Sequence, residues 1–542
     1  MAKPKSKPQL SLLSAHVYDD AAGIPEGHWS RLFFAQVRCA FDDAAFADLY
    51  EEGGRYPIAP GFLASVLVLQ YLFRVSDRGA VENTIVRRDW RIALGITAEY
   101  QGFCPTVLTR FRQRLAKGER PQLILQQVLA RCRELGLLRG RRVRVDALQM
   151  LSDLAQLNRA DCLQEAIRLV VVSAEERYPE LWSQEEFMRL YERYGVESWV
   201  GGGSSSEARL RELGRDGYQL GVRLGEREVE GKATLAQVLA ENFIVEEDDG
   251  PRPRGPEERL EDRIATPHDP QARYGSKGDH VWLGRQVHVV EIVSEEGPNL
   301  VTEVQVTDPR REDSTVLPEI VERVRSGTPE VDTIIADAGY ASAANSEQAA
   351  EQGIDLVTPP RRNTNPGLLA AEAFDLDFEG QVARCPEGHE SRVWSVGKKE
   401  LRIRFPAATC AACPRRSACT TSSQGRMLHL SLHYPQLRRD RQRAQTEAFR
   451  NLYRQRAGIE ATLSKLVHQH GLRRSRYRGA PFEALHAGLA AAALNVRRML
   501  AWLAQPAVRG ARAATATLLS AARVAVGCGR ALTAPCPLAA PA

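Results

Sequence analysis

Apolar residues recur at three- and four-residue spacing through the first part of the chain, which is typical of helices with one buried face. Gly and Pro break the pattern into short segments, so it predicts an all-helical domain over about residues 11–120. The last segment places Leu108, Phe111 and Leu115 on one face and basic residues on the others. Such a helix either docks on DNA or presents a solvated charged face.

Alternation of apolar and polar residues then predicts β-strands. One half-buried strand covers Arg142–Asp146 and ends at Asp146. The runs His280–Val293 and Asn299–Val306 flank a Glu-Glu-Gly-Pro turn, which is typical of a hairpin. A short uncharged run, Thr333–Ala336, predicts a central strand with Asp337 at its C-terminal end. Helical segments between the later strands indicate a layered mixed sheet.

Two stretches interrupt this sheet pattern. About residues 177–262 are polar, charged and mostly helical, with a flexible Gly/Ser link at 201–206, and nothing there suggests a strand pair. About residues 360–427 break into Pro, Gly and Arg with short strands. We interpret both as insertions into a core that spans residues 121–505, which gives a multidomain protein of the α+β or α/β class.

The helix after the sheet carries the densest charge. Residues Phe449–Arg478 read as one helix that runs into a basic turn, and an Ala-rich helix follows over Phe482–Leu503. Tyr453, Arg456 and Glu460 are spaced to project from one helix face. Either Glu460 simply pairs with Arg456 on a surface helix, or it is a carboxylate mounted for a metal that faces a phosphate backbone.

Composition narrows the class of protein. The 542 residues are 43% hydrophobic and 26% charged, as in soluble globular proteins with more than one core. Net charge is only +5, so the basic signal is local. We find no membrane-span pattern and no secretory signal, and we expect a cytoplasmic protein without a membrane partner. The stretches 1–10 and 506–542 are predicted to be disordered tails.

Most of the cysteines are scattered, but one cluster has ligand-like spacing. Cys410 and Cys413 form a Cys-x2-Cys pair, Cys419 follows six residues on, and Cys385 lies 25 residues upstream of the pair. One interpretation is a structural zinc site, to which His389 also contributes. The alternatives are reduced thiols in a small core and a redox pair.

Three acids stand at comparable positions: Asp146 and Asp337 at strand ends and Glu460 on a later helix. A lone Asp after a strand is commonly a turn former or a helix cap. Three carboxylates together can hold two Mg²⁺ or Mn²⁺ ions, which activate one oxygen and stabilise another in phosphodiester chemistry.

These residues resemble bacterial insertion-sequence transposases of the DDE superfamily, the branch with an InsH-like N-terminal domain. Asp146 in Val-Arg-Val-Asp-Ala matches the family's first catalytic Asp, and Asp337 in Asp-Ala-Gly-Tyr matches the second. Tyr453, Arg456 and Glu460 match its Tyr-x2-Arg-x3-Glu signature, which ends in the catalytic Glu. The resemblance implies an RNase H-like catalytic core behind a DNA-binding N-terminal domain.

The resemblance also implies an activity. The protein would bind the inverted-repeat ends of its element and catalyse Mg²⁺-dependent cleavage and strand transfer, working as a homodimer on double-stranded repeat and target DNA. The residues implied to contact DNA are Tyr453, Arg456, Arg473, Arg474 and Arg476. The alternatives are an RNase H-like nuclease that only hydrolyses DNA and a catalytically inactive DNA-binding protein or repressor.

The chain departs from the family pattern at two positions. Val467 stands where a Lys usually follows the Glu by seven residues, with Lys465 two residues early, and Leu148 stands where a small hydroxyl residue commonly follows the first Asp. Both departures keep the three carboxylates and change a phosphate-positioning contact. Four further residues are candidates either for DNA contact or for ordinary sheet and loop roles: Tyr274, Lys277, Trp282 and Lys399.

Overall fold

The computed structural model describes residues 21–50, 58–117, 120–154, 157–194, 206–246, 250–258, 260, 262–360, 368–398 and 400–505. The predicted tails 1–10 and 506–542, most of the Gly/Ser link and Lys399 lie outside these residues.

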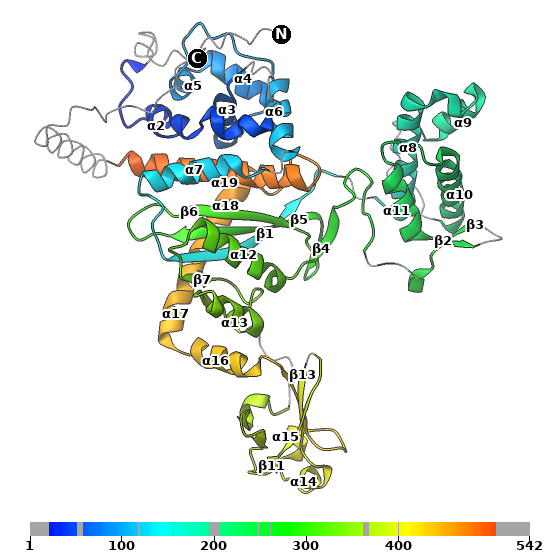
Figure 1. The fold of residues 1–542 in the computed structure, drawn as a ribbon, viewed down its shortest axis with the longest axis vertical. Coiled ribbons are helices and arrows are strands. Elements are labelled where there is room, and N and C mark those ends of the chain that lie inside the picture. Colours follow the sequence, from blue (N-terminus) through cyan, green and yellow to red (C-terminus); the bar gives the residue numbers. More distant parts are fainter. Residues whose placement is uncertain are drawn as a thin grey trace, which may run out of the picture.

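The N-terminal part is helical, as predicted. The central helix, α3, is buried on all sides because its sequence is apolar all round; it begins with Pro60 and ends where Arg74 takes a left-handed conformation (φ 55°). The other helices surround it (Figure 1). In chain order the elements are α2 (Trp29–Gln36), η1 (Arg38–Ala40), η2 (Asp43–Leu49), α3 (Pro60–Phe73), α4 (Asp77–Val86), α5 (Arg88–Leu94), α6 (Thr106–Lys117) and α7 (Leu123–Glu134).

A mixed sheet forms the middle of the molecule. The strand order is β4-β5-β1-β7-β8, and β6 also pairs with β5. The β1–β7 and β7–β8 pairs are parallel, whereas β5 runs antiparallel to β1, β4 and β6. The mixed α/β class predicted from the sequence is therefore confirmed. The strands are β1 (Arg142–Leu151), β4 (Arg273–Lys277), β5 (His280–Val293), β6 (Leu300–Thr307), β7 (Thr333–Ile335) and β8 (Asp355–Val357).

Helices from both ends of the core pack on this sheet. Helix α12 (Asp313–Gly327) packs on β6, and α13 (Ala343–Glu351) packs on β8. The 24-residue helix α19 (Ala480–Leu503) is almost wholly buried because it contacts β6 on one side and α3, α6 and α7 on the other. One continuous hydrophobic core therefore runs from the N-terminal helices through α19 into the sheet.

The prediction of one continuous helix in Phe449–Arg478 is wrong, because the segment is interrupted. It divides into α17 (Glu447–Tyr453), a 3-10 turn η6 (Arg454–Arg456) and α18 (Ala457–His470), and it ends at Gly471, which takes a left-handed conformation (φ 76°) as a C-cap. Helix α16 (Tyr434–Ala444) precedes them. Within the described residues, no helix is long and apolar enough to cross a membrane.

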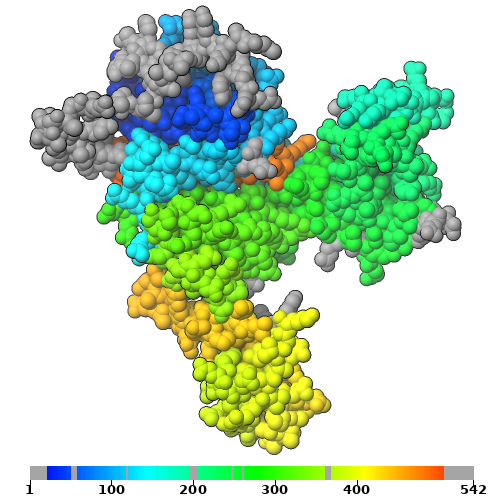
Figure 2. All heavy atoms as spheres, in the orientation of Figure 1, coloured from blue at the N-terminus to red at the C-terminus, as the bar shows by residue number. Residues whose placement is uncertain are grey.

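A separate lobe is inserted after β1, with its own hydrophobic core (Figures 1 and 2). The prediction that this stretch lacks a strand pair is wrong, because the β-prone run Phe-Ile-Val pairs antiparallel with the strand that begins at Gly250. The lobe consists of α8 (Arg159–Arg177), η3 (Pro179–Leu181), α9 (Gln184–Tyr194), α10 (Glu207–Leu224), α11 (Lys232–Asn242), β2 (Phe243–Glu246), β3 (Gly250–Pro253) and η4 (Pro256–Glu258).

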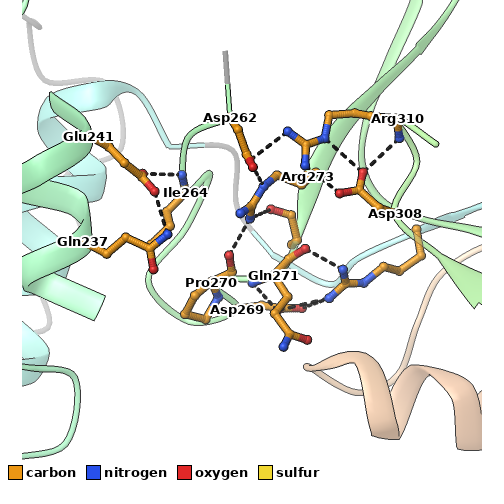
Figure 3. A network of polar contacts seen from close by, with 12 residues as sticks. Gln237, Glu241, Asp262, Ile264, Asp269, Pro270, Gln271, Arg273, Asp308 and Arg310 are labelled. Atoms are coloured by element: carbon orange, nitrogen blue, oxygen red, sulfur yellow. Dashed lines mark hydrogen bonds and ion pairs between the residues drawn. The ribbon is translucent and has the colours of Figure 1, made fainter. Parts of the chain in front are cut away.

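Polar contacts hold the chain that returns from this lobe against the sheet (Figure 3). The Asp262 carboxylate accepts hydrogen bonds from Arg273 (2.5 Å) and from Arg310 (2.8 Å). Deeper inside, Arg285 on β5 donates to Glu483 (2.8 Å) and lies 3.3 Å from an oxygen of Asp269. The lobe is thus joined to the sheet by ion pairs.

The cysteine-bearing segment forms a small domain beyond α16 (Figure 1). Its strands make two three-stranded antiparallel sheets around a small core. The elements are η5 (Ala371–Ala373), β9 (Asp375–Asp377), β10 (Val382–Arg384), β11 (Glu390–Ser391), β12 (Val393–Val396), β13 (Glu400–Arg404), α14 (Ala407–Ala411), α15 (Arg416–Cys419) and β14 (Met427–Ser431).

Candidate active site

Asp146 and Asp337 lie on neighbouring parallel strands. The prediction that Asp146 ends its strand is wrong, since β1 continues to Leu151 along its antiparallel partner β5. The parallel partner β7, however, pairs with β1 only as far as Arg144. Asp146 therefore lies just past the end of that pairing, and Asp337 follows β7 with its carboxylate accepting the amide hydrogen of Gly339 (2.8 Å). Both acids therefore lie at the end of the sheet where the β1–β7 pairing stops.

Arg456 connects two of the three predicted catalytic acids. Its Nη2 lies 2.9 Å from Oδ2 of Asp146, and its Nη1 lies 3.1 Å from Oε1 of Glu460. The i to i+4 pair predicted between Arg456 and Glu460 is confirmed. The Asp146 side chain is only 15% exposed, whereas Glu460 is 65% exposed. The guanidinium thus links a buried acid on the sheet to an open acid on α18.

The charges of this region act on one another. Burial raises the pKa of Asp146, and the charge of Asp337 raises it further, while Arg456 opposes both. Burial also raises the pKa of Tyr453, and the charges of Asp337, Asp146 and Glu460 add to that effect. Because the three acids all act on the Tyr453 hydroxyl, they share one electrostatic environment.

The three acids suit a divalent cation in their chemistry. Carboxylate oxygens are the ligands that Mg²⁺ and Mn²⁺ prefer, and Arg456 shows that the space between Asp146 and Glu460 accepts a positive charge. In the present arrangement, no three His, Cys, Asp or Glu residues of the described chain are placed as they would be around a metal ion. A cation held by Asp146, Asp337 and Glu460 would therefore require these acids to move closer, and it would compete with Arg456 for Asp146 and Glu460.

A buried hydrogen-bond network that the sequence analysis missed supports the Asp337 turn. The ring of His288, on β5, contacts the Tyr340 hydroxyl (2.6 Å) and the Thr307 hydroxyl (3.0 Å). Burial lowers the pKa of His288 to about 4, so the ring is neutral at neutral pH. In the sequence, only the presence of Tyr340 in the Asp-Ala-Gly-Tyr motif could have indicated this network. His288 lies between valines and looks like an ordinary strand residue.

Asp313, at the start of α12, is a further acid near the site. A Cβ atom added at Gly339 would lie 2.6 Å from an oxygen of Asp313 and 2.9 Å from an oxygen of Asp337. The two carboxylates therefore approach the same small space, which a side chain at position 339 would fill. The Asp313 carboxylate also accepts a hydrogen bond from Gln286 (2.6 Å).

A cavity of about 620 Å³ opens at Ala147, the residue after Asp146, and none of the three predicted catalytic acids lines it. Leu148 and Val467, the two departures from the family pattern, both line it. Arg473, which is predicted to contact DNA, lines it too, as do Lys277 and Trp282, which are candidates either for DNA contact or for ordinary sheet and loop roles. Tyr274 is not among its lining residues and is 37% exposed.

The basic turn after α18 lies against the end of β1. The Leu151 amide donates to the Arg473 carbonyl (2.9 Å), and the Ser475 amide donates to the Leu151 carbonyl (2.7 Å). The side chains of Arg473, Arg474 and Arg476 are exposed. The turn therefore presents cationic side chains at the strand that carries Asp146.

The four clustered cysteines make no disulfide. Cys385, Cys410 and Cys419 pack against the small core of their domain, and the Arg426 amide donates to the Cys410 sulfur (3.3 Å). This packing matches the alternative of thiols in a small core. The zinc site, in which Cys413 was a fourth ligand, stays a prediction.

Comparisons with known proteins match both ends of the chain. Residues 21–114 match a family described as "Transposase domain (DUF772)", and residues 384–500 match one described as "Transposase DDE domain". The second match contains Glu460 but neither of the two aspartates. A search of curated proteins found no match. A solved structure, the cryo-EM structure of the piggyBac transposase synaptic complex with hairpin DNA, is 10% identical, with a TM-score of 0.28 over 87% of this chain and 74% of that chain.

Proposed function

We propose, from the premise that this chain belongs to the DDE transposase family, that it is an active DNA transposase. It would bind the inverted-repeat ends of its element, cut the DNA there and join the ends to target DNA as a homodimer. The observation that carries the proposal is the Arg456 guanidinium, which links Asp146 to Glu460 at the sheet edge where Asp337 also lies.

Asp146, Asp337 and Glu460 would hold the metal ions in this proposal. Two bound Mg²⁺ or Mn²⁺ ions would supply activation of the attacking oxygen and stabilisation of the leaving oxygen. Burial of Asp146 disfavours an unpaired carboxylate there, so Arg456 neutralises it before DNA arrives. A guanidinium also binds phosphate through two parallel hydrogen bonds, so a DNA phosphate competes with these acids for Arg456.

The remaining side chains position the DNA. Arg473, Arg474 and Arg476 would contact phosphates beside the scissile bond, which steers the strand across the sheet edge. In cleavage, a water oxygen forms a new bond to phosphorus and the 3′-oxygen leaves as a hydroxyl. In joining, that 3′-hydroxyl attacks a target phosphate and displaces another 3′-oxygen. Each step exchanges one phosphorus–oxygen bond for another, so the reaction needs no energy cofactor.

The test uses the purified full chain and a duplex that carries its flanking repeat. We compare wild type, Glu460→Gln and Glu447→Gln in Mg²⁺, Mn²⁺ and EDTA. Glu447 is a matched control, since it is an exposed acid at the start of the neighbouring helix α17. We expect metal-dependent cutting and joining by wild type and the control, and a loss on the order of 100-fold or more in Glu460→Gln.

Other outcomes identify the two alternatives. Cutting without any joining of a 3′-hydroxyl end would indicate a nuclease. Specific binding of the repeat, with wild type and Glu460→Gln equally inert in both metals, would indicate a repressor. In that case Leu148 and Val467, which line the cavity at Ala147, are the first positions to change.

A further inference from the structure

A buried charge network lies directly beneath the segment that carries Arg456 and Glu460. Its centre is Glu291 on β5, whose side chain has no exposed surface. Arg144 on β1 is its direct cross-strand partner, and Arg144 Nε donates to Oε2 of Glu291 (2.5 Å). Arg144 precedes Asp146 by two residues, so both side chains emerge on the same face of β1.

This network contacts the catalytic segment on both sides. Before Arg456, Nη1 of Arg144 donates to the backbone carbonyl of Gln455 in the 3-10 turn (2.9 Å). After Glu460, the Thr462 hydroxyl donates to the other oxygen of Glu291. The segment from 455 to 462 is therefore attached to the sheet at each end by groups that belong to one ion pair.

The exposed side of the segment offers Glu460 little support. Its side chain is 65% exposed and pairs with Arg456, which stands on the same segment. Arg456 also reaches Asp146 (2.9 Å), which gives the segment one direct link to the sheet. The contacts of Arg144 with the Gln455 carbonyl and of Glu291 with the Thr462 hydroxyl add a second, buried link, which flanks Glu460 on both sides.

Gly458 shows how closely the segment lies on this network. A Cβ atom there would lie 2.0 Å from Nη1 of Arg144, a separation that real atoms do not adopt. The guanidinium has little freedom to withdraw because Glu291 and Gln455 both bind it. A methyl group at position 458 must therefore displace either the helix start or the guanidinium.

We infer that Arg144 and Glu291 are positioning residues, which hold the turn and the start of α18 so that Glu460 meets Asp146 and Asp337 at one metal site. This inference rests on the proposed function. Neither residue touches the DNA or the metal; they act through the backbone of the segment. Arg498 completes the network by donating to the same Glu291 oxygen as Thr462 (2.6 Å).

The first test compares Arg144→Lys with Arg285→Lys. A lysine ammonium keeps the positive charge but lacks the forked geometry that reaches Glu291 and the Gln455 carbonyl together. Arg285 is the matched control, because it is also buried on β5 and bridges two acids, Asp269 and Glu483, away from the catalytic segment. Both variants lose one buried arginine fork.

Two measurements separate positioning from stability. In Arg144→Lys we expect the Mg²⁺ concentration for half-maximal cleavage to rise about 10-fold or more, and amide hydrogen exchange over residues 455–462 to quicken by a similar factor. In Arg285→Lys both quantities stay at the wild-type value. The inference is overturned if Arg144→Lys matches wild type in both, or if Arg285→Lys changes both equally.

Gly458→Ala is the second variant and decides the question if Arg144→Lys does not fold. Alanine favours a helix more than glycine does, so helix propensity alone predicts no loss of protection in α18, and any faster exchange there reports the clash with Arg144. Positioning predicts instead a raised Mg²⁺ requirement and faster exchange at 455–462 with all charges retained. Unchanged values in Gly458→Ala would overturn the inference. The exchange measurement needs no activity, so it decides on positioning even if wild type proves inert and the proposed function fails.

Discussion

The N-terminal domain and the inserted lobe are both helical, yet they are attached to the sheet in opposite ways. The N-terminal helices share one hydrophobic core with α19 and the sheet. The lobe has a core of its own, and its return segment meets the sheet through ion pairs such as Asp262 with Arg310 (Figure 3). Apolar contact over a long helix resists rotation, whereas exposed ion pairs hold weakly. The N-terminal domain is therefore continuous with the sheet, and the lobe is joined to it by a much smaller set of contacts.

The strongest way to break this comparison is a pair of core truncations. Leu489 on α19 and Leu163 on α8 are both fully buried, so replacing either with Ala is expected to cost about 2–5 kcal/mol. Leu489→Ala should destabilise the N-terminal domain and the sheet together, while Leu163→Ala should destabilise the lobe alone. Hydrogen exchange resolved by segment measures this. Loss of protection in the lobe after Leu489→Ala would contradict separate cores.

Acid should weaken the N-terminal attachment before it weakens the lobe. His470 and His486 both contact Tyr71 at the seam between α3 and the C-terminal helices. Burial lowers the pKa of each to about 4. An exposed imidazole takes up its proton near pH 6.5, whereas these buried rings stay neutral until the pH is much lower. Between these two pH values the unfolded chain binds more protons than the folded protein, so acid favours unfolding. The stabilisation is complete above about pH 6.5 and is lost as the pH falls towards 4, by at most ~3 kcal/mol per histidine.

The stability of the lobe changes over a different pH range. Although burial opposes it, Arg168 and His268 hold the pKa of Glu165 at about 2. Its contribution is present above the ordinary Glu range and is lost only as the pH falls towards 2. Urea unfolding at pH 7.5 and 5.0, followed by exchange in each region, should show lost stability in the N-terminal domain and the sheet, which share one core, but not in the lobe. Replacing His486 with Gln should flatten that dependence, and an unchanged slope would contradict this account.

The smallest expected effect concerns the hinge of the lobe. Asp262→Asn removes the charge that pairs with Arg273 and Arg310, and its side chain is 62% exposed, so the loss of stability should be about 1 kcal/mol or less. Limited proteolysis of the segment 260–272 should nevertheless quicken, because fewer contacts hold it to the sheet. Asp153→Asn, at another exposed ion pair with Arg474, serves as the control. Equal proteolysis of wild type and Asp262→Asn would show that the hinge is held by other contacts.

Sequence reasoning proposed Asp146, Asp337 and Glu460 as candidate acids, but it did not find the residues that support the segments carrying them. The strand run before Asp337 and the helical spacing of Tyr453, Arg456 and Glu460 are local patterns, so they are readable without a structure. Arg144 also fits a local pattern, that of a polar face on a half-buried strand, and this pattern misleads. β1 is central, so the face of Arg144 is covered by the segment 455–462 and the arginine is buried.

The interruption of the predicted long helix was missed for a similar reason. Between Phe449 and Ala457 there is no Gly or Pro that would indicate an interruption of the helix. The 3-10 turn lies where Arg144 reaches the Gln455 carbonyl from the sheet, so it coincides with a contact between residues 311 positions apart. A contact between residues so far apart produces no local pattern of apolar and polar residues, so it cannot be predicted from the sequence. The strand pair in the lobe, by contrast, had a local signal in its β-prone run.

The position of helix α19 near the end of the chain also affects how the protein folds during synthesis. It is shared by the N-terminal helices and the sheet, yet α7 ends at Glu134 and α19 begins only at Ala480. At ribosomal rates of about 5–20 residues per second, the finished N-terminal helices wait roughly 20–70 s for the element that covers them. During that interval the apolar faces of α3 and α7 that α19 later covers have no final partner in the nascent chain. Production of this protein should therefore depend on chaperones that shield those helices until the last helix leaves the ribosome.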